Sequence, residues 1–259
     1  MDYHPPELQV SKSPSASVNR LRENNVHLEI PAGSKFQYRL AQLDDHGTHQ
    51  RSRFRWKPPL SFSLQARVSA QALPGTWGFG LWNDPFNFAI TYNLLMPRMP
   101  ALPDAAWFFY AASENYLSIY DDLPSNGFLA ATFSSVKVPT AALILSSPIL
   151  ALALLPGAAQ GVRRLLRRWV KQDASQVQAC LTDWHLYRIE WETQQVAFYM
   201  DDVELKRTDI LPHPPLSLVI WIDNQYAALP PGGRLKFGYS AHPEPAWMEI
   251  KDIRMQADV

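Results

Sequence analysis

Apolar and polar residues alternate at every second position in several short segments of the chain. The clearest case is residues 60–68, where Leu60, Phe62, Leu64, Ala66 and Val68 would share one face of a strand. Similar short runs, separated by polar or proline-containing turns, predict further strands at 26–30, 35–40, 75–82, 105–112, 127–133, 184–191, 196–200, 216–222, 233–239 and 247–255. Strands do not alternate with helices in this pattern. It therefore predicts an all-β, two-sheet antiparallel sandwich.

The segment 184–202 carries the densest strand pattern. Trp-His-Leu-Tyr-Arg-Ile-Glu-Trp, a polar break and Gln-Val-Ala-Phe-Tyr-Met-Asp-Asp predict a hairpin, with a third strand starting at Val203. This segment resembles one found in laminarinase-like glycoside hydrolases (family 16) and related concanavalin A-like proteins. Segments 62–68, 75–82, 216–224 and 248–255 match that family in the same order. The resemblance covers about residues 25–135 and 182–256, and it implies a concanavalin A-like jelly roll.

The catalytic signature of that family is missing from this chain. The family carries Glu-x-Asp-x-(x)-Glu on the strand that follows the Gly/Trp-rich one, and a retaining glycosidase needs two carboxyl groups about 5 Å apart. The corresponding strand here, 105–112, reads Ala-Ala-Trp-Phe-Phe-Tyr-Ala-Ala, and Glu114 stands alone beyond it. Glycoside hydrolysis by the family mechanism is therefore not expected.

Aromatic residues take the place of those acids. Trp107 and Tyr110 on this strand, with Trp82 and Trp221 from strands before and after it, predict an apolar, π-rich cleft. The glycines of Gly-Thr-Trp-Gly-Phe-Gly-Leu-Trp at 75–82 indicate that a backbone or a ligand comes close to that strand. The alternative is that these rings fill the core of the sandwich.

Two polar clusters lie at the ends of the same strands, where loops of sandwiches form binding sites. The expected ligand-binding members are Asn83, Asn87, Asn224 and Tyr226. Asp84 and Asp223 are the candidate catalytic acids or bases, because an apolar environment raises the pKa of a carboxyl group. Their alternative role is to cap turns.

Residues 136–178 are expected to form an inserted helical hairpin. The stretch 138–156 has no charge, although its length barely reaches the roughly 20 residues that span a bilayer. The second half predicts an amphipathic helix. Its apolar stripe consists of Val162, Leu165, Leu166 and Trp169, and its opposite face carries Arg163, Arg164, Arg167 and Arg168. Three roles of the insertion stay open: a lid with solvated arginines, a contact of segment 138–172 with a membrane surface, and a membrane span by the apolar run. The first two are compatible with each other.

Composition narrows the functional classes. The chain has 259 residues, of which 47 % are hydrophobic and 12 % aromatic, so a single sandwich domain at 25–259 behind an N-terminal arm at 1–24 is expected. The formal net charge of zero gives no field that would attract nucleic acid. Cys180 is the only cysteine, and no histidine pair has the spacing of a zinc site. No catalytic metal and no cofactor are therefore expected. The resemblance to concanavalin A-like proteins leaves a structural Ca²⁺ site at loop carboxylates open, for which the sequence has no motif. The amino terminus does not read as a signal peptide, which predicts a cytoplasmic protein, peripheral at the inner face of the membrane if segment 138–172 touches it.

Two classes of function follow from these patterns. The first is binding of a hydrophobic small molecule such as a terpenoid, polyketide or lipid, with acid/base isomerisation or cyclisation by Asp84 or Asp223. The second is a non-catalytic module that binds carbohydrate or glycolipid with the same Trp, Asn and Asp side chains. The sequence leaves the oligomeric state undetermined.

Overall fold

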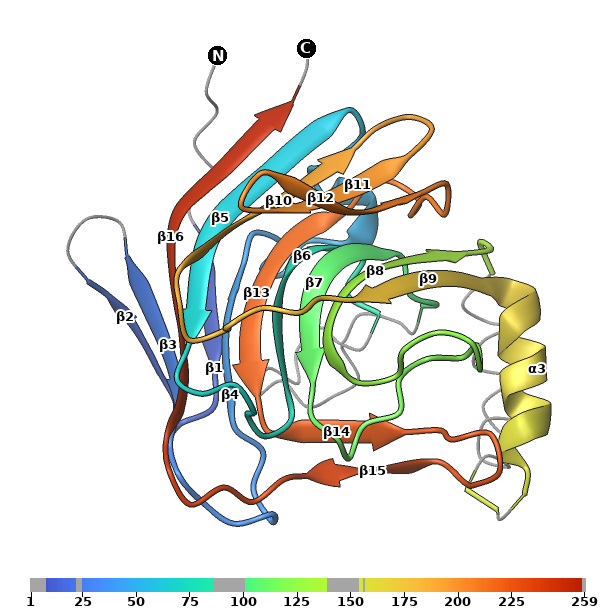
Figure 1. Cartoon of the computed structure of the whole chain (residues 1–259), viewed down its shortest axis with the longest axis horizontal. Coiled ribbons are helices and arrows are strands. Elements are labelled where there is room, and N and C mark those ends of the chain that lie inside the picture. The colour runs from blue at the N-terminus through green and yellow to red at the C-terminus, as the bar shows by residue number, and fades with distance from the viewer. Residues whose placement is uncertain (1–7, 22–24, 86–100, 139–153, 156, 258–259) are drawn as a thin grey trace.

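The computed structural model describes residues 8–21, 25–85, 101–138, 154–155 and 157–257, and two seven-stranded antiparallel sheets dominate this part of the chain (Figure 1). The first sheet has the order β1 (Gln9–Lys12), β4 (Leu40–Asp44), β13 (Ser217–Asp223), β6 (Thr76–Trp82), β7 (Ala105–Ala111), β8 (Gly127–Ser135) and β9 (Val170–Gln176). The second has the order β12 (Val203–Thr208), β11 (Val196–Met200), β10 (His185–Trp191), β5 (Leu60–Val68), β16 (Ala246–Ala257), β3 (Val26–Ile30) and β2 (Ser17–Arg20).

Three smaller elements complete the described chain. The strands β14 (Gln225–Ala228) and β15 (Lys236–Tyr239) form a separate hairpin, which lies at the bottom of Figure 1. A short 3-10 helix, η1, covers Arg51–Arg53, and the α-helix α3 covers Ala159–Trp169. Helix α3 stands at the right of Figure 1 and leads directly into β9, an edge strand of the first sheet.

The main core fills the space between the two sheets. Alternate residues of each strand point into it, as on β5, where all five apolar residues of the predicted stripe are buried. Rings from both sheets meet there: Phe79 lies 5.0 Å from Tyr187, and Phe108 lies 5.3 Å from Phe198, between ring centroids. This packing confirms the all-β sandwich that the period-2 pattern predicts.

One predicted strand is displaced along the sequence. Residues 35–37 form a turn, and the strand β4 begins only at Leu40, the last residue of the strand predicted at 35–40, and ends at Asp44. The pattern Lys-Phe-Gln-Tyr-Arg-Leu alternates, but Phe36 is 83 % exposed and Arg39 is 3 % exposed. The buried guanidinium of Arg39 donates to the carbonyls of Ser34 and Gln37, which stabilises the turn instead of a strand.

The expected insertion is shorter than 136–178 and is not a helical hairpin in the described residues. Its first half falls mostly at 139–153, outside those residues, and its second half is the single helix α3. Residues Val170–Gln176, which were included in the insertion, form β9 and pair with β8 along its length. Residues 9–12 and 17–20 of the expected N-terminal arm likewise pair as the edge strands β1 and β2.

Candidate functional site

The outer face of the first sheet carries a second set of aromatic side chains, turned away from the main core. On β6, β7 and β13 the residues that alternate with the core positions point outward. We call this surface the aromatic face, and it consists of Trp82, Trp107, Phe109, Phe133 and Trp221. The three tryptophans that the sequence singles out are therefore neighbours on one face, outside the layer between the sheets.

The rings of the aromatic face are in mutual contact. The indoles of Trp82 and Trp221 lie almost parallel, with centroids 6.3 Å apart and 6° between their planes. Trp107 leans against both, at 6.3 Å from Trp82 and 5.5 Å from Trp221. Phe109 and Phe133 extend the cluster from Trp107 at 5.5 and 5.9 Å.

Two glycines of β6 make room for these indoles. A Cβ added to Gly78 would lie 2.8 Å from a ring carbon of Trp221, and one added to Gly80 would lie 2.6 Å from the Cα of Trp107. The close approach expected at the Gly-rich strand is therefore made by neighbouring strands and an indole ring of the protein itself.

Part of the aromatic face is covered by the described chain. Leu117 and Ile119, from the loop between β7 and β8, pack against the cluster, and so does Trp169 at the end of α3. The side chain of Trp107 is buried, with 7 % of its surface exposed. Trp82 and Trp221 remain partly exposed, so they form the accessible part of the face.

Two indole N–H groups on this face have no acceptor among the described residues. The Nε1 atoms of Trp82 and Trp107 are buried and make no hydrogen bond to that part of the chain, whereas Nε1 of Trp221 donates to Oγ1 of Thr76 at 3.0 Å. A buried donor without a partner costs about 1–3 kcal/mol. The aromatic face thus holds unused donor capacity beside its apolar rings.

Asp223 lies on the same side of β13 as Trp221 but is extensively hydrogen-bonded. Its Oδ1 accepts bonds from the Thr76 backbone (3.1 Å), the Thr76 hydroxyl (2.9 Å) and the Gln225 backbone (3.1 Å), and the Tyr38 hydroxyl donates to Oδ2 at 3.4 Å. Burial raises the pKa of Asp223 to about 7, against the opposing effect of these donors. Asp223 therefore anchors the ends of β13 and β6 and can exist in either protonation state near neutral pH.

The polar residues at the end of β6, Asn83 and Asp84, are hydrogen-bonded to neighbouring segments of the chain. Asp84 is 4 % exposed and adopts a positive φ of 49°, a conformation that Asp tolerates in turns, and its carbonyl accepts a bond from Arg51. The Asn83 amide donates to the Leu102 carbonyl at 2.8 Å, and its oxygen accepts from the Asp104 backbone at 3.1 Å. Asn83 thus joins the end of β6 to the start of β7, and Asp84 is joined to η1. Asn87 lies outside the described residues.

The other expected ligand-binding residues lie away from the aromatic face. Asn224 is fully buried, where it accepts from the Arg39 backbone and donates to the carbonyls of Gln37 and Ser240. Tyr110 points into the main core, where its ring stacks on Trp77 at 5.8 Å, because it sits three residues from Trp107 and so faces the opposite side of the strand. Tyr226 lies on β14, in the separate hairpin.

An Asp–His pair beside Trp82 escaped the sequence reading. Asp44 Oδ1 lies 3.0 Å from His46 Nδ1, and the imidazole of His46 stacks between Phe54 (5.4 Å) and Trp82 (6.2 Å). In the sequence, Asp44 and His46 belong to a polar stretch that reads as a loop. Asp44 lies on the same face as Trp221 because it is the last residue of β4, which pairs with β13. No sequence pattern in this loop signals that contact.

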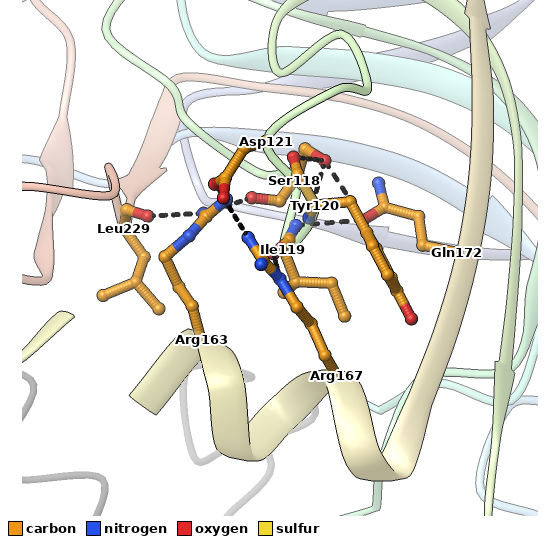
Figure 2. Close-up of polar contacts among 8 residues, drawn as sticks. All are labelled: Ser118, Ile119, Tyr120, Asp121, Arg163, Arg167, Gln172 and Leu229. Atoms are coloured by element: carbon orange, nitrogen blue, oxygen red, sulfur yellow. Dashed lines mark hydrogen bonds and ion pairs between the residues drawn. The ribbon is translucent and has the colours of Figure 1, made fainter. Parts of the chain in front are cut away.

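Helix α3 is fastened to the sandwich by two of the arginines expected to face solvent or lipid headgroups. Arg163 is 1 % exposed and donates to the carbonyls of Ser118 (2.5 Å) and Leu229 (2.8 Å), while Arg163 and Arg167 both reach Asp121 at 2.6 Å (Figure 2). The pKa of Asp121 is lowered by hydrogen bonds from Arg167 and Arg163. These contacts hold the loop that carries Ile119 onto the aromatic face.

The two faces of α3 therefore differ from the expected division. Val162 is buried and Leu165, Leu166 and Trp169 are partly buried, so the apolar stripe is directed largely at the protein. Arg164 and Arg168 are exposed. No helix in the described part of the chain is long and apolar enough to cross a membrane. The membrane-surface contact and the cytoplasmic location stay predictions.

Within the described residues, no three His, Cys, Asp or Glu side chains are grouped so that they could hold a metal ion. Strand β7 carries no carboxylate. What remains is a partly covered aromatic surface with unpaired indole donors and a titratable Asp at one end.

Comparison with known proteins returns similar structures but no close relative. No protein-family model and no curated protein matches the chain. A glycoside hydrolase family protein from Mycobacterium thermorestibile shares 14 % identity over 90 % of this chain and 76 % of that one, with a TM-score of 0.47. A family-16 endo-glucanase from Bacteroides ovatus shares 10 % identity over 96 % and 85 %, with a TM-score of 0.48.

The ganglioside- and protein-recognising modules of toxins are also among the similar structures. The binding domain of botulinum neurotoxin DC, in complex with SialylT, shares 8 % identity over 98 % of this chain but only 43 % of that one, with a TM-score of 0.42.

Proposed function

We propose that this protein binds carbohydrate on the aromatic face without cleaving it. The observation that carries the proposal is the parallel pair Trp82 and Trp221, 6.3 Å apart and partly exposed on the outer face of the first sheet. A pyranose ring presents an apolar C–H face and a rim of hydroxyl groups. Indole faces suit the first, because they offer large, rigid apolar area. The lack of a carboxylate on β7 separates binding from hydrolysis.

A second candidate is an apolar small molecule processed by Asp223. Its support is the pKa of about 7 on a carboxyl group that shares a face with Trp221, which suits an acid or base in an isomerase or cyclase. Against it, the described partners of Asp223 occupy Oδ1 with three donors. Carbohydrate binding needs no free carboxyl oxygen, so it is the function that this geometry favours.

The experiment is a calorimetric titration of the protein with oligosaccharides of laminarin, mixed-linkage glucan and agar, beside the same titration with farnesol as an apolar probe. The variants Trp82→Ala and Trp221→Ala should each lose at least tenfold in affinity for the saccharide that binds, as aromatic hot spots do. Trp184→Ala is the matched control, because Trp184 is a partly exposed indole outside the aromatic face, stacked against Arg67 and Lys251. Binding of farnesol alone, abolished by Asp223→Asn or by the Trp variants, would favour the second candidate.

A further inference from the structure

The side of α3 that faces away from the sandwich carries two exposed arginines. Arg164 and Arg168 lie one turn apart on the helix and therefore project from the same face. The helix has 11 residues and is about 16 Å long, and it stands at the edge of the molecule beyond β9 (Figure 1). Together with the exposed residues at its two ends, these arginines form what we call the α3 surface: Val136, Lys137, Leu154, Leu155, Arg164 and Arg168.

Aliphatic side chains are exposed at both ends of this helix. Leu154 and Leu155 precede it and are 46 % and 55 % exposed, and the amide of Ala158 donates to the Leu155 carbonyl at 3.3 Å. Val136, 49 % exposed, lies at the other end, where its amide donates to the carbonyl of Trp169 at 2.8 Å. The α3 surface thus combines outward cations with apolar side chains that the protein leaves uncovered.

The positive charge of this surface is not balanced locally. Residues 123–172 contain six Lys or Arg and no Asp or Glu, although the chain as a whole has a formal net charge of zero. The two inward arginines of the helix both bind Asp121 at 2.6 Å. Among the described residues, no carboxylate forms an ion pair with Arg164, Arg168 or Lys137.

We propose that the α3 surface binds the surface of an anionic membrane. Its cations contact the phosphates of the lipid headgroups, and its exposed aliphatic side chains enter the boundary between the headgroups and the acyl chains. A nucleic acid would match the charge alone. Proteins that bind single strands also stack bases on aromatic side chains, whereas Trp169, the one aromatic residue of α3, packs against the aromatic face.

The attachment is peripheral, because the helix cannot lay its apolar stripe into the bilayer. Val162 is buried, and Leu165 and Leu166 are partly buried by the protein. The contact is therefore made by a few outward cations and the aliphatic side chains beside them. Binding of this kind depends on the content of anionic lipid and weakens as salt screens the charges. It needs no carbohydrate on the aromatic face.

The test is co-sedimentation with vesicles of phosphatidylcholine, with and without phosphatidylglycerol. The wild-type protein should bind the vesicles that contain phosphatidylglycerol, more tightly at low salt than at high salt. Arg164→Ser/Arg168→Ser should lose roughly thirtyfold in affinity for these vesicles at low salt. Arg164→Lys/Arg168→Lys keeps both charges and should bind as the wild type does.

A second pair of variants tests the aliphatic side chains. Leu154→Ser/Leu155→Ser should lose roughly tenfold in affinity at low and at high salt alike, because the apolar contribution is not screened. Val10→Ser is the matched control, since Val10 is 49 % exposed on β1, at the opposite edge of the first sheet from β9. It should bind the vesicles as the wild type does.

The control for the charges is Arg20→Ser/Arg254→Ser, which removes two exposed cations from β2 and β16 of the second sheet. It should leave vesicle binding unchanged. A Tm equal to that of the wild type shows that a variant has not lost its fold. Oligosaccharide binding should be the same in all of these variants as in the wild type, which separates this surface from the aromatic face.

Three results would overturn the proposal. The first is no binding to vesicles that contain phosphatidylglycerol at low salt, or equal binding to vesicles without it. The second is a variant Arg164→Ser/Arg168→Ser that binds these vesicles as the wild type does. The third is binding of a single-stranded RNA that is tighter than vesicle binding and is lost in the same variant.

Discussion

The indole of Trp221 lies directly over Gly78 on the neighbouring strand, so close that a Cβ at position 78 would stand 2.8 Å from the ring. The same Cβ would meet the Phe108 carbonyl at 2.5 Å. Trp221 can therefore occupy this position, parallel to Trp82, only because residue 78 is a glycine.

Gly78→Ala should displace Trp221 and destabilise the first sheet by about 1–3 kcal/mol, as overpacking does. Chemical denaturation measures the free energy of unfolding, and the near-ultraviolet circular dichroism of the coupled indoles reports their displacement. Gly161→Ala is the control, since nothing lies within 4 Å of a Cβ at that position in α3. It should be neutral or stabilise the protein by up to about 1 kcal/mol. An unchanged dichroism spectrum in Gly78→Ala would contradict the packing described here.

Asp223 should make the protein less stable as the pH rises. The pKa of this carboxyl is about 7 in the folded protein and near its ordinary value of 3.8 in the unfolded chain. Between about pH 4 and pH 7 the folded state therefore binds more protons, so the free energy of unfolding falls as the pH increases, by at most about 1.4 kcal/mol per pH unit from this group.

Asp223→Asn removes that titration and keeps the shape of the side chain. The free energy of unfolding of the variant should depend less on pH between 4 and 7 than that of the wild type, as urea denaturation at each pH would show. Two parallel curves would mean that Asp223 ionises in the folded protein as it does in the unfolded chain. Asp45, whose pKa burial raises to about 6, contributes in the same direction and is present in both proteins.

The buried arginine of α3 should be necessary for stability, whereas its exposed neighbour should not. Arg163→Leu leaves the carbonyls of Ser118 and Leu229 without a donor and is expected to cost about 2–4 kcal/mol. Arg164→Leu changes an exposed residue of the same helix and should stay within about 0.5 kcal/mol of the wild type. If both variants unfold at the same urea concentration, α3 is not fastened by Arg163.

The protein should not hydrolyse the glycans it meets. Incubation with β-glucans, agar or carrageenan should release no more reducing sugar than a heat-denatured control, because β7 carries no acid pair. Reducing sugar well above that background, released by the wild type and by Asp223→Asn alike, would show a catalytic pair outside the strand where the family carries it.

The strands of the two sheets could be predicted from the sequence because a strand with one buried face carries apolar residues at every second position. Leu60 to Val68 alternate perfectly and form β5, and the five segments that resemble family-16 proteins are all strands. Which side of the sheet a side chain faces depends on its position along the strand and not on its residue type. Trp107 and Tyr110 are three residues apart, so Trp107 lies on the aromatic face and Tyr110 lies in the main core. Only the alternation on β7, read together with that of its neighbours, could have separated them.

Long-range contacts were beyond the sequence. The period that predicts an amphipathic helix at 157–172 is correct for α3, yet it cannot reveal that Arg163 finds Ser118 and Leu229 in distant loops. Nor does it show that the chain changes at Val170 into β9, which pairs with β8. Deletion of 138–172 would remove the start of β9 and should therefore destabilise the first sheet.

The most direct measurement of carbohydrate binding is an NMR titration of the indole N–H resonances, assigned with single Trp→Phe variants. On addition of the polysaccharide that binds most tightly, the Nε1–H signals of Trp82 and Trp221 should shift furthest, because these two indoles are the partly exposed tryptophans of the aromatic face on which the sugar is proposed to stack. Those of Trp191 in the main core and Trp184 outside the aromatic face should stay in place. Shifts confined to Trp184, or none at saturating ligand, would contradict a carbohydrate site on the aromatic face.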